Sequence, residues 1–321
     1  MSHPRLGITL GDPAGIGPEI VAVALASAAP ALLARVIVYG DRGPLERGAR
    51  AMGVNLPTGV AVVGDGVGER AVPGAPDEVS GAAQVGYLEA AVAAAQASEL
   101  AAIVTAPISK TWAKRAGFAF PGHTEMLAER LGARDVVMMF AGPRLKVALA
   151  TVHVPLREVA HVLTTLRLRR VIELLAESLV RDFGIAAPRI GVVGLNPHAG
   201  EGGLLGAEDH EVIAPALTAL PPSILSGPLI PDAAFRDALH GSVDALVAQY
   251  HDQGLIPVKL IDFDEAVNLT LGLPIVRTSP DHGTAYDIAG KGVARAVSMQ
   301  RALELAVAMV ERRSGPLSTA P

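Results

Sequence analysis

The sequence contains no cysteine, so it can form neither a disulfide bond nor a thiolate metal site. A metal ion would have to be bound through histidine, aspartate or glutamate side chains. Aromatic residues make up only 3% of the 321 residues, whereas hydrophobic residues as a whole make up 50%. This combination predicts a core of Ala, Val, Leu and Ile, which is typical of sheets that are covered by helices.

An excess of basic residues and long apolar runs are also absent. The formal net charge of −5 disfavours nucleic acid as the main partner, because binding to a phosphate backbone requires a basic surface. The first residues lack the basic and apolar segments of a signal peptide, and the most apolar windows are too short to span a bilayer. We therefore expect a cytoplasmic protein with no membrane segment and a small-molecule partner.

Short apolar runs alternate with helix-forming stretches along the chain. The run at 6–10, for example, enters a glycine-rich turn at 11–17, which is followed by an Ala- and Val-rich stretch. Such alternation predicts an α/β fold with mostly parallel sheets covered by helices. The turn at 11–17 is interpreted either as an anion site at a helix N-terminus or as a tight turn without a ligand.

Three histidines share one context, because His153, His198 and His251 each come directly or soon after a predicted strand. The carboxyl ends of parallel strands meet at one edge of a sheet, so three imidazoles there would suit a divalent metal ion. The alternative is that they are ordinary packing residues. Asp232 and Asp252 could add a carboxylate ligand or orient an imidazole.

Lys259, Asn268 and Arg277 lie between apolar runs, where an unused charge would be costly. They are interpreted as a polar clamp for a carboxylate or phosphate, with Lys259 also a candidate acid or base. His123 and Thr124 open a predicted helix, next to free backbone amides that favour an anion. The alternative for these two residues is an ordinary helix cap.

The longest motifs resemble those of the 4-hydroxythreonine-4-phosphate dehydrogenase (PdxA) family nearly from end to end. They are GDPAGIGPE (11–19), VTAPISK (104–110), PGHTE (121–125), TVHVPL (151–156), NPHAGEGG (196–203), YHDQGLIPVK (250–259) and VNLTLGLPIVRTSPDHGTAYDIAGKG (267–292). GIGPE and HGTAYDIAGKG are also similar, more distantly, to loops of isocitrate and isopropylmalate dehydrogenases. The resemblance implies their two-domain α/β fold, with residues 1–130 plus 293–321 in one domain, 131–292 in the other and an active-site cleft between them.

The resemblance also implies a homodimer and a set of site residues. One divalent metal ion (zinc, magnesium, manganese or cobalt) would be held by His153, His198 and His251, and the partner subunit could contribute the last of these. His123 and Thr124 would bind the substrate phosphate. The remaining residues form two groups: Lys259, Asn268 and Arg277 would contact the substrate, and His282, Gly283, Thr284 and Asp287 would lie against the adenosine part of NAD or NADP.

The implied reaction is oxidation of a secondary alcohol with NAD(P)+, followed by loss of CO2, to give 3-amino-2-oxopropyl phosphate for pyridoxal 5′-phosphate biosynthesis. Lys259 and Asp232 are the candidate catalytic residues, and Lys259 or a water on the metal would move the proton. One departure lies beside Asp232: the family often has Pro-Ala-Asp-Thr here, and this chain has Ala233 in place of the threonine.

Other functions stay open on the sequence alone. The same chemistry could act on D-threonate or D-erythronate 4-phosphate, and an isopropylmalate-like diacid is disfavoured because enzymes acting on such diacids bind their metal through aspartates. A phosphate acyltransferase of related fold would need neither NAD nor metal, and a catalytically silent binding protein would have no use for the clamp. No arginine-rich stretch lies near 282–292, which favours NAD over NADP.

Overall fold

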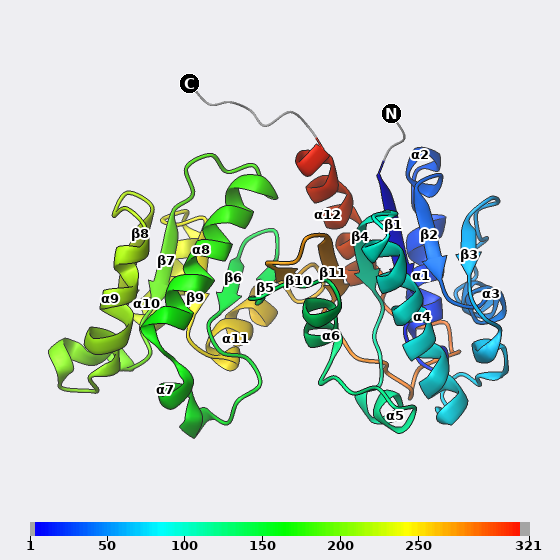
Figure 1. Ribbon diagram of the computed structural model, residues 1–321, viewed down its shortest axis with the longest axis horizontal. Helices are drawn as coiled ribbons and strands as arrows, with labels where there is room; N and C mark the ends of the chain where they lie inside the picture. The colour runs from blue at the N-terminus through cyan, green and yellow to red at the C-terminus, as the bar shows by residue number, and fades with distance from the viewer. Residues whose placement is uncertain (1–3, 315–321) are drawn as a thin grey trace. The chain divides into compact units, whose positions relative to one another are not determined.

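The computed structural model describes residues 4–314, and their contacts divide the chain into two compact units (Figure 1). Unit 1 comprises Met1–Arg134 with Leu273–Val310, and unit 2 comprises Asp135–Gly272 with Glu311–Pro321. The segment 273–292 therefore belongs to unit 1 and not, as expected, to the second domain. The physical reason is strand pairing, because β11 (Val276–Pro280) pairs in parallel with β4 (Leu100–Thr105).

Unit 1 contains a parallel sheet in the order β3-β2-β1-β4-β11. Its other strands are β1 (Arg5–Thr9), β2 (Val36–Tyr39) and β3 (Ala61–Val63). Its helices are α1 (Gly17–Ala26), α2 (Pro30–Leu33), α3 (Arg42–Ala51), η1 (Val67–Arg70), α4 (Glu78–Gln96), α5 (Lys110–Arg115), α6 (His123–Arg130) and most of α12 (Val297–Ser314). β1 and β4 are buried along almost their whole length, as expected for parallel strands covered on both faces.

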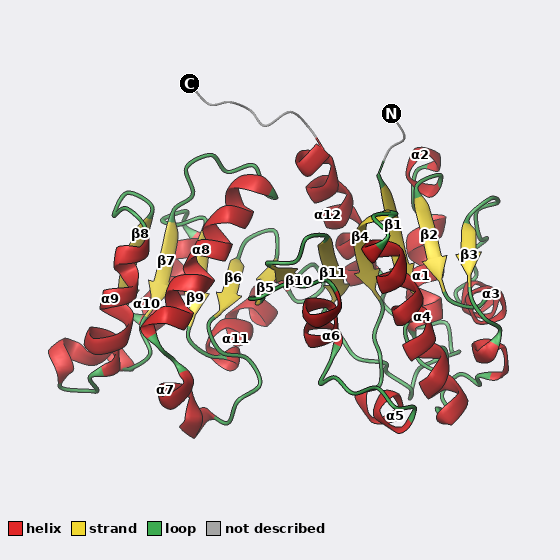
Figure 2. Cartoon of the chain, in the orientation of Figure 1, coloured by secondary structure: helices red, strands yellow, loops and turns green. Residues whose placement is uncertain are grey.

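Unit 2 contains strands in the order β10-β5-β6-β9-β7-β8. The strands are β5 (Val137–Ala141), β6 (Lys146–Leu149), β7 (Ile190–Val193), β8 (Leu225–Leu229), β9 (Ala245–Ala248) and β10 (Val267–Leu271). β5 pairs antiparallel with both β10 and β6, whereas β6, β9, β7 and β8 run parallel. The mostly parallel α/β fold that the sequence predicts is thus confirmed, and in each unit helices flank the strands (Figure 2).

The helices of unit 2 are long only where they cover the sheet. They are η2 (Leu156–Glu158), α7 (Val159–Val162), α8 (Thr165–Arg181), η3 (Pro197–Gly203), η4 (Asp209–Ile213), α9 (Ala214–Ala216), η5 (Leu217–Ala219), α10 (Pro231–Leu239) and α11 (His251–Asp262). Phe140, Val147, Leu246 and Leu255 belong to one buried cluster, and Gly254 of α11 packs against side chains of β6 and β9.

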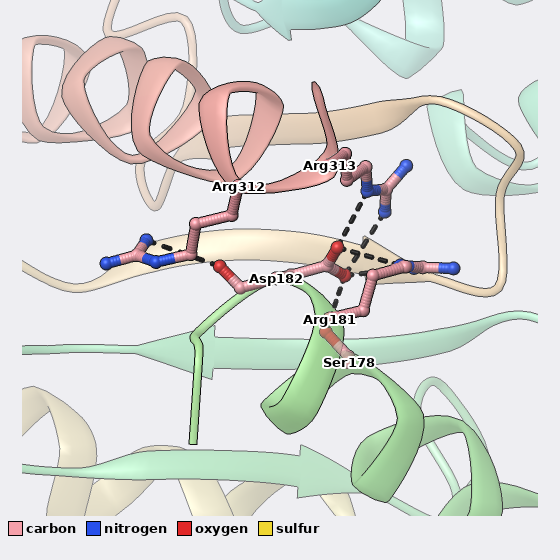
Figure 3. A network of polar contacts seen from close by, with 5 residues as sticks. All are labelled: Ser178, Arg181, Asp182, Arg312 and Arg313. Atoms are coloured by element: carbon pink, nitrogen blue, oxygen red, sulfur yellow. Dashed lines mark hydrogen bonds and ion pairs between the residues drawn. The ribbon is translucent and has the colours of Figure 1, made fainter. Parts of the chain in front are cut away.

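A buried carboxylate joins the end of α8 to the last turn of α12 (Figure 3). Asp182 accepts hydrogen bonds from the guanidinium groups of Arg181 and Arg313 and from the hydroxyl of Ser178, and its carbonyl oxygen accepts one from Arg312. Burial alone would raise the pKa of this carboxyl, but the bonds from Arg181 and Arg313 outweigh it and lower the pKa.

Within residues 4–314, no helix is both long and apolar enough to cross a membrane.

Candidate active-site residues

The three histidines of unit 2 follow three adjacent parallel strands at their carboxyl ends. His153 follows β6, His251 follows β9 and begins α11, and His198 follows β7 within η3. The rings of His153 and His251 lie side by side, with centroids 5.6 Å apart and planes tilted by 41°. The expected edge of the sheet therefore carries all three residues and brings two of the imidazoles together.

The donor chemistry of this imidazole pair fits a divalent metal ion. Nδ1 of His251 lies 2.6 Å from Oδ1 of Asp252, which is the arrangement that leaves the other ring nitrogen of a histidine ready for a metal. No group of three or more His, Asp or Glu side chains in the described part of the chain is arranged to hold an ion. His198 and Asp232 therefore do not complete the set in one chain, and the pair supplies only part of a coordination sphere.

His198 lies in a segment with an unusual backbone. Its φ is +52°, and Ala199 and Glu201 also have positive φ, a conformation that costs roughly 1–2 kcal/mol for each residue with a side chain. The carboxylate of Asp209 stabilises the start of this segment by accepting hydrogen bonds from the backbone amides of Leu195 and Asn196, at 2.8 and 3.1 Å. The sequence gives no signal for this role of Asp209.

Two glutamines tie the start of α11 to the end of β7. Nε2 of Gln249 donates to the carbonyl oxygen of Val193 at 2.6 Å, and Nε2 of Gln253 donates to that of Gly194 at 2.7 Å. The amide of Gln249 in turn donates to Oε1 of Gln253. These bonds fix His251 relative to the strand that leads to His198. Both glutamines lie near His251 in the sequence, but only the tertiary contacts reveal their function.

The other predicted residues of unit 2 lie apart from the imidazole pair. Asp232 is exposed in the first turn of α10, where the helix dipole favours a carboxylate. Lys259 comes eight residues after His251 on α11, about 12 Å along the helix axis, and its Nζ lies 5.8 Å from the ring centroid of Phe263. Asn268 lies on β10, and its buried Oδ1 has no hydrogen-bond partner among the described residues.

Unit 1 gathers groups that suit an anion. Arg277 on β11 is only 4% exposed, and its Nη2 donates to Oγ1 of Thr105 at 2.8 Å. His123 is the first residue of α6 and is followed by the half-buried Thr124. Nε2 of His123 is buried and has no partner within residues 4–314. A buried polar atom of this kind is costly unless a ligand satisfies it.

The pKa values of His123 and Arg277 are both lowered, and they leave the imidazole neutral and the guanidinium group charged. Burial, and then the positive charges of Arg277 and Lys110, hold the pKa of His123 well below its usual range, so its imidazole is neutral near pH 7. Burial lowers the pKa of Arg277 to about 10, so this side chain stays charged. The arrangement offers a neutral donor and a fixed cation to a phosphate or carboxylate.

The loop that carries His282, Gly283, Thr284 and Asp287 is held by the motif at 11–19. The amide of Ile16 donates to the carbonyl oxygen of Thr284, and the hydroxyl of Tyr286 donates to Oδ2 of Asp12 at 2.7 Å. The buried carboxylate of Glu19 accepts bonds from the amides of Gly290 and Gly292, both at 3.0 Å. Burial raises the pKa of Asp12.

These bonds decide between the two interpretations of the glycine-rich turn. The amides of Asp12, Gly15 and Ile16 all donate to backbone carbonyl oxygens, and that of Ala14 donates to the carboxylate of Asp12. A Cβ at Gly15 would lie 2.8 Å from the carbonyl oxygen of Thr284, so this glycine permits a close approach of the loop. The motif is therefore a tight turn that positions a second loop.

Comparison with known proteins gives the class of this two-unit α/β protein, an oxidoreductase. The model of the family "Pyridoxal phosphate biosynthetic protein PdxA" matches residues 33–306. A 4-hydroxythreonine-4-phosphate dehydrogenase of Synechocystis sp. is 44% identical over 98% of both chains. The chain belongs to the PdxA family.

Solved structures extend the comparison. A 4-hydroxythreonine-4-phosphate dehydrogenase from Klebsiella pneumoniae is 38% identical, with a TM-score of 0.85 over 96% of this chain and 98% of that one. A terephthalate 1,2-cis-dihydrodiol dehydrogenase from Burkholderia xenovorans is 30% identical, with a TM-score of 0.67 over 96% and 98%. These names point to dehydrogenases whose substrates differ.

Proposed function

We propose that this enzyme oxidises 4-phosphooxy-L-threonine at its secondary hydroxyl group with NAD(P)+ and that the resulting β-keto acid loses CO2, giving 3-amino-2-oxopropyl phosphate for pyridoxal 5′-phosphate biosynthesis. The observation that carries the proposal is the buried donor group of His123 and Arg277, in a chain that belongs to the PdxA family. The family match also supports a dehydrogenase over a phosphate acyltransferase of related fold.

The substrate phosphate is assigned to His123, Thr124 and Arg277 of unit 1. A neutral imidazole donates one hydrogen bond, and a guanidinium group adds charge and a second donor. Asn268 of unit 2 is assigned to the amino acid part of the substrate, because its buried Oδ1 can accept a hydrogen bond from an ammonium group. Lys259 remains the candidate for moving the proton, and Asp232 the candidate for assisting it.

The divalent metal ion is assigned to His153 and His251, with His198 as the third predicted ligand. When bound, such an ion would supply positive charge to the hydroxyl and carboxylate oxygens of the substrate. Imidazole ligands favour zinc or cobalt over magnesium. Because one chain supplies an incomplete set, we propose that two subunits of a homodimer complete the coordination together.

The helix that begins with His251 supports the homodimer. Ile256, Leu260 and Phe263 are 58%, 81% and 63% exposed, and their spacing of four and three residues places them on one face of α11 and its end. A stripe of large exposed apolar side chains marks an interaction surface. A second subunit that covers this stripe would also lie near Lys259.

The nicotinamide cofactor is assigned to the loop of His282, Gly283, Thr284 and Asp287. Gly283 and Asp287 are exposed, and no atom lies within 4 Å of the position that a Cβ would take at Gly283, so a ligand can approach the backbone there. The absence of an arginine-rich stretch near this loop favours NAD over NADP. The cytoplasmic location stays a prediction.

The first experiment measures NADH formation from 4-phosphooxy-L-threonine, D-threonate 4-phosphate and D-erythronate 4-phosphate, each with and without a chelator. We expect turnover of the amino acid that a chelator abolishes and added metal restores. Turnover of only a sugar-acid phosphate would favour the second candidate function, which Ala233 supports because it replaces a family threonine beside Asp232. No reduction with any of the three would contradict both candidates.

A further inference from the structure

Lys110 lies beside the proposed phosphate site but is not one of the residues assigned to the phosphate, His123, Thr124 and Arg277. It is the first residue of α5, shortly after β4. Gly122 is the N-cap of α6, and a Cβ at that position would lie 3.7 Å from Cε and 4.0 Å from Nζ of Lys110. The ammonium group therefore lies next to the start of the helix that begins with His123. The same Cβ would lie 3.3 Å from Oε2 of Glu125, so the carboxylate of Glu125 is also nearby.

The charge of Lys110 is not used to stabilise the fold. Within residues 4–314, its ammonium group forms no hydrogen bond and no ion pair, and the nearby carboxylate of Glu125 forms none either. As the first residue of α5, Lys110 also lies where the helix dipole disfavours a cation. Lys114 and Arg115, in the last turn of the same helix, lie where the dipole favours one. The dipole at the start of α5 would thus favour an anion beside Lys110.

Two observations point to the same anion. Nε2 of His123 is buried and without a partner among the described residues, and the positive charges of Arg277 and Lys110 both act on this imidazole. The two cations and the orphaned donor therefore converge on one place at the start of α6. With one carboxylate nearby, Glu125, the excess charge is about +1 before a ligand binds.

We propose that Lys110 binds the phosphate group of the substrate as a third donor beside His123 and Arg277. The inference rests on the proposed function only for the identity of the phosphorylated substrate. That a phosphate group binds at Lys110 does not depend on it. A phosphate group offers three terminal oxygens, which matches three separate donors. Because Lys110 is exposed and Arg277 is buried, the lysine side chain would close over the phosphate after it binds.

The test is the binding of inorganic phosphate to the full-length protein, measured by calorimetry. Lys110→Met should weaken phosphate binding by roughly tenfold or more, as expected for loss of a charge-assisted hydrogen bond. Lys114→Met is the matched control, an exposed lysine four residues later on the same helix, and it should bind phosphate as the unchanged protein does. Lys110→Arg should restore most of the affinity.

A kinetic measurement separates binding from chemistry. For the phosphorylated substrate, Lys110→Met should raise KM by a similar factor and change kcat little, because the lysine does not contact the reacting atoms. Phosphate binding that Lys110→Met leaves unchanged, or that Lys114→Met weakens equally, would overturn the inference. If Lys110→Met weakens phosphate binding but no substrate is oxidised by the unchanged protein, the proposed function fails while this inference stands.

Discussion

The two units present opposite chemistry. Unit 1 gathers a buried cation (Arg277), an exposed cation (Lys110) and a neutral donor (His123) around one place. Unit 2 presents the imidazoles of His153 and His251, and a neutral imidazole keeps one ring nitrogen that can coordinate a metal ion. The first arrangement suits an anion and the second a cation. The substrate phosphate is therefore assigned to unit 1 and the divalent metal ion to unit 2.

The units also differ in the apolar surface that they expose. Among residues 4–314, the large exposed hydrophobic residues of unit 1 are valines, whereas those of unit 2 include Leu156, Leu166, Leu204, Leu260 and Phe263. Bigger apolar side chains contribute more free energy when a partner covers them. The large exposed apolar side chains thus lie in the same unit as the imidazole pair, where we propose that a second subunit binds.

The largest expected effect follows from removing one imidazole of the pair. His251→Ala should lower kcat/KM about 10³-fold or more, because the proposed metal ion would contribute several kcal/mol to stabilising the transition state. Calorimetric titration with zinc should show weaker binding, while inorganic phosphate should bind as before. A variant that loses phosphate binding as well would break the proposed division of charge between the units.

A smaller effect is expected at the exposed stripe of α11. Leu260→Asp places a charge on the stripe and should weaken dimerisation by roughly 10- to 100-fold, since it removes apolar burial and adds a desolvation cost. Sedimentation analysis across protein concentrations measures this change. Lys291→Asp in unit 1 is the control, because Lys291 is exposed and lies away from the stripe in the sequence. Equal dissociation of both variants would contradict an interface on α11.

The backbone before His198 depends on the carboxylate of Asp209. Asp209→Asn replaces one carboxylate oxygen with an NH2 group, which donates hydrogen bonds. The amides of Leu195 and Asn196 are donors too, so one of them would lose its acceptor. We expect metal affinity to fall about tenfold, as for other groups that orient metal ligands. Asp182→Asn, a buried carboxylate of the same unit that contacts Arg181 and Arg313 instead, should reduce stability without changing metal affinity (Figure 3).

The smallest effect is a difference in the sign of pH dependence. The lowered pKa of Asp182 means that it stabilises unit 2 above pH 3.8, the usual value, and that this contribution is lost as the pH falls through its folded pKa. The raised pKa of Asp12 has the opposite sign: its contribution is present below pH 3.8 and is lost as the pH rises through its folded pKa.

Thermal unfolding between pH 2 and 7 measures both contributions. In Asp182→Asn, the unfolding temperature should fall less steeply as the pH is lowered at the acidic end. In Asp12→Asn, the decline of the unfolding temperature above pH 3.8 should become smaller, by a few degrees at most. If the slope of the unfolding temperature against pH changes in the same direction in both variants, the opposite contributions predicted for Asp12 and Asp182 are contradicted.

The sequence predicts local features well because they depend on local pattern. The alternation of strands and helices, and the placement of His153, His198 and His251 after parallel strands, follow from short apolar runs and the rule that carboxyl ends share an edge. The sequence does not reveal that the segment 273–292 has its contacts in unit 1, because β11 pairs with β4, which is far away in the sequence.

The support of the candidate site could not be predicted, since it depends on tertiary contacts. Asp209, Gln249 and Gln253 act through hydrogen bonds to backbone groups on other strands, and no residue spacing encodes such bonds. Lys110 lies within a recognised motif, but its relation to Gly122 appears only when α5 and α6 are placed in space. Conversely, the turn at 11–17 has the pattern of an anion site, yet the amides of Asp12, Ala14, Gly15 and Ile16 donate to groups within the protein.

The bonds from Glu19 to Gly290 and Gly292 join residues that are 271 and 273 positions apart. A ribosome adds only about 5–20 residues per second, and domains generally fold as units during synthesis. Unit 1 therefore lacks β11 and the loop that follows it, up to Gly292, until almost the whole chain has been made. The main segment of unit 2, Asp135–Gly272, emerges earlier. The nascent protein should thus form the pair of His153 and His251 before it can bring Arg277 to His123. A chain that ends before residue 292 should never form the loop that Glu19 holds through Gly290 and Gly292.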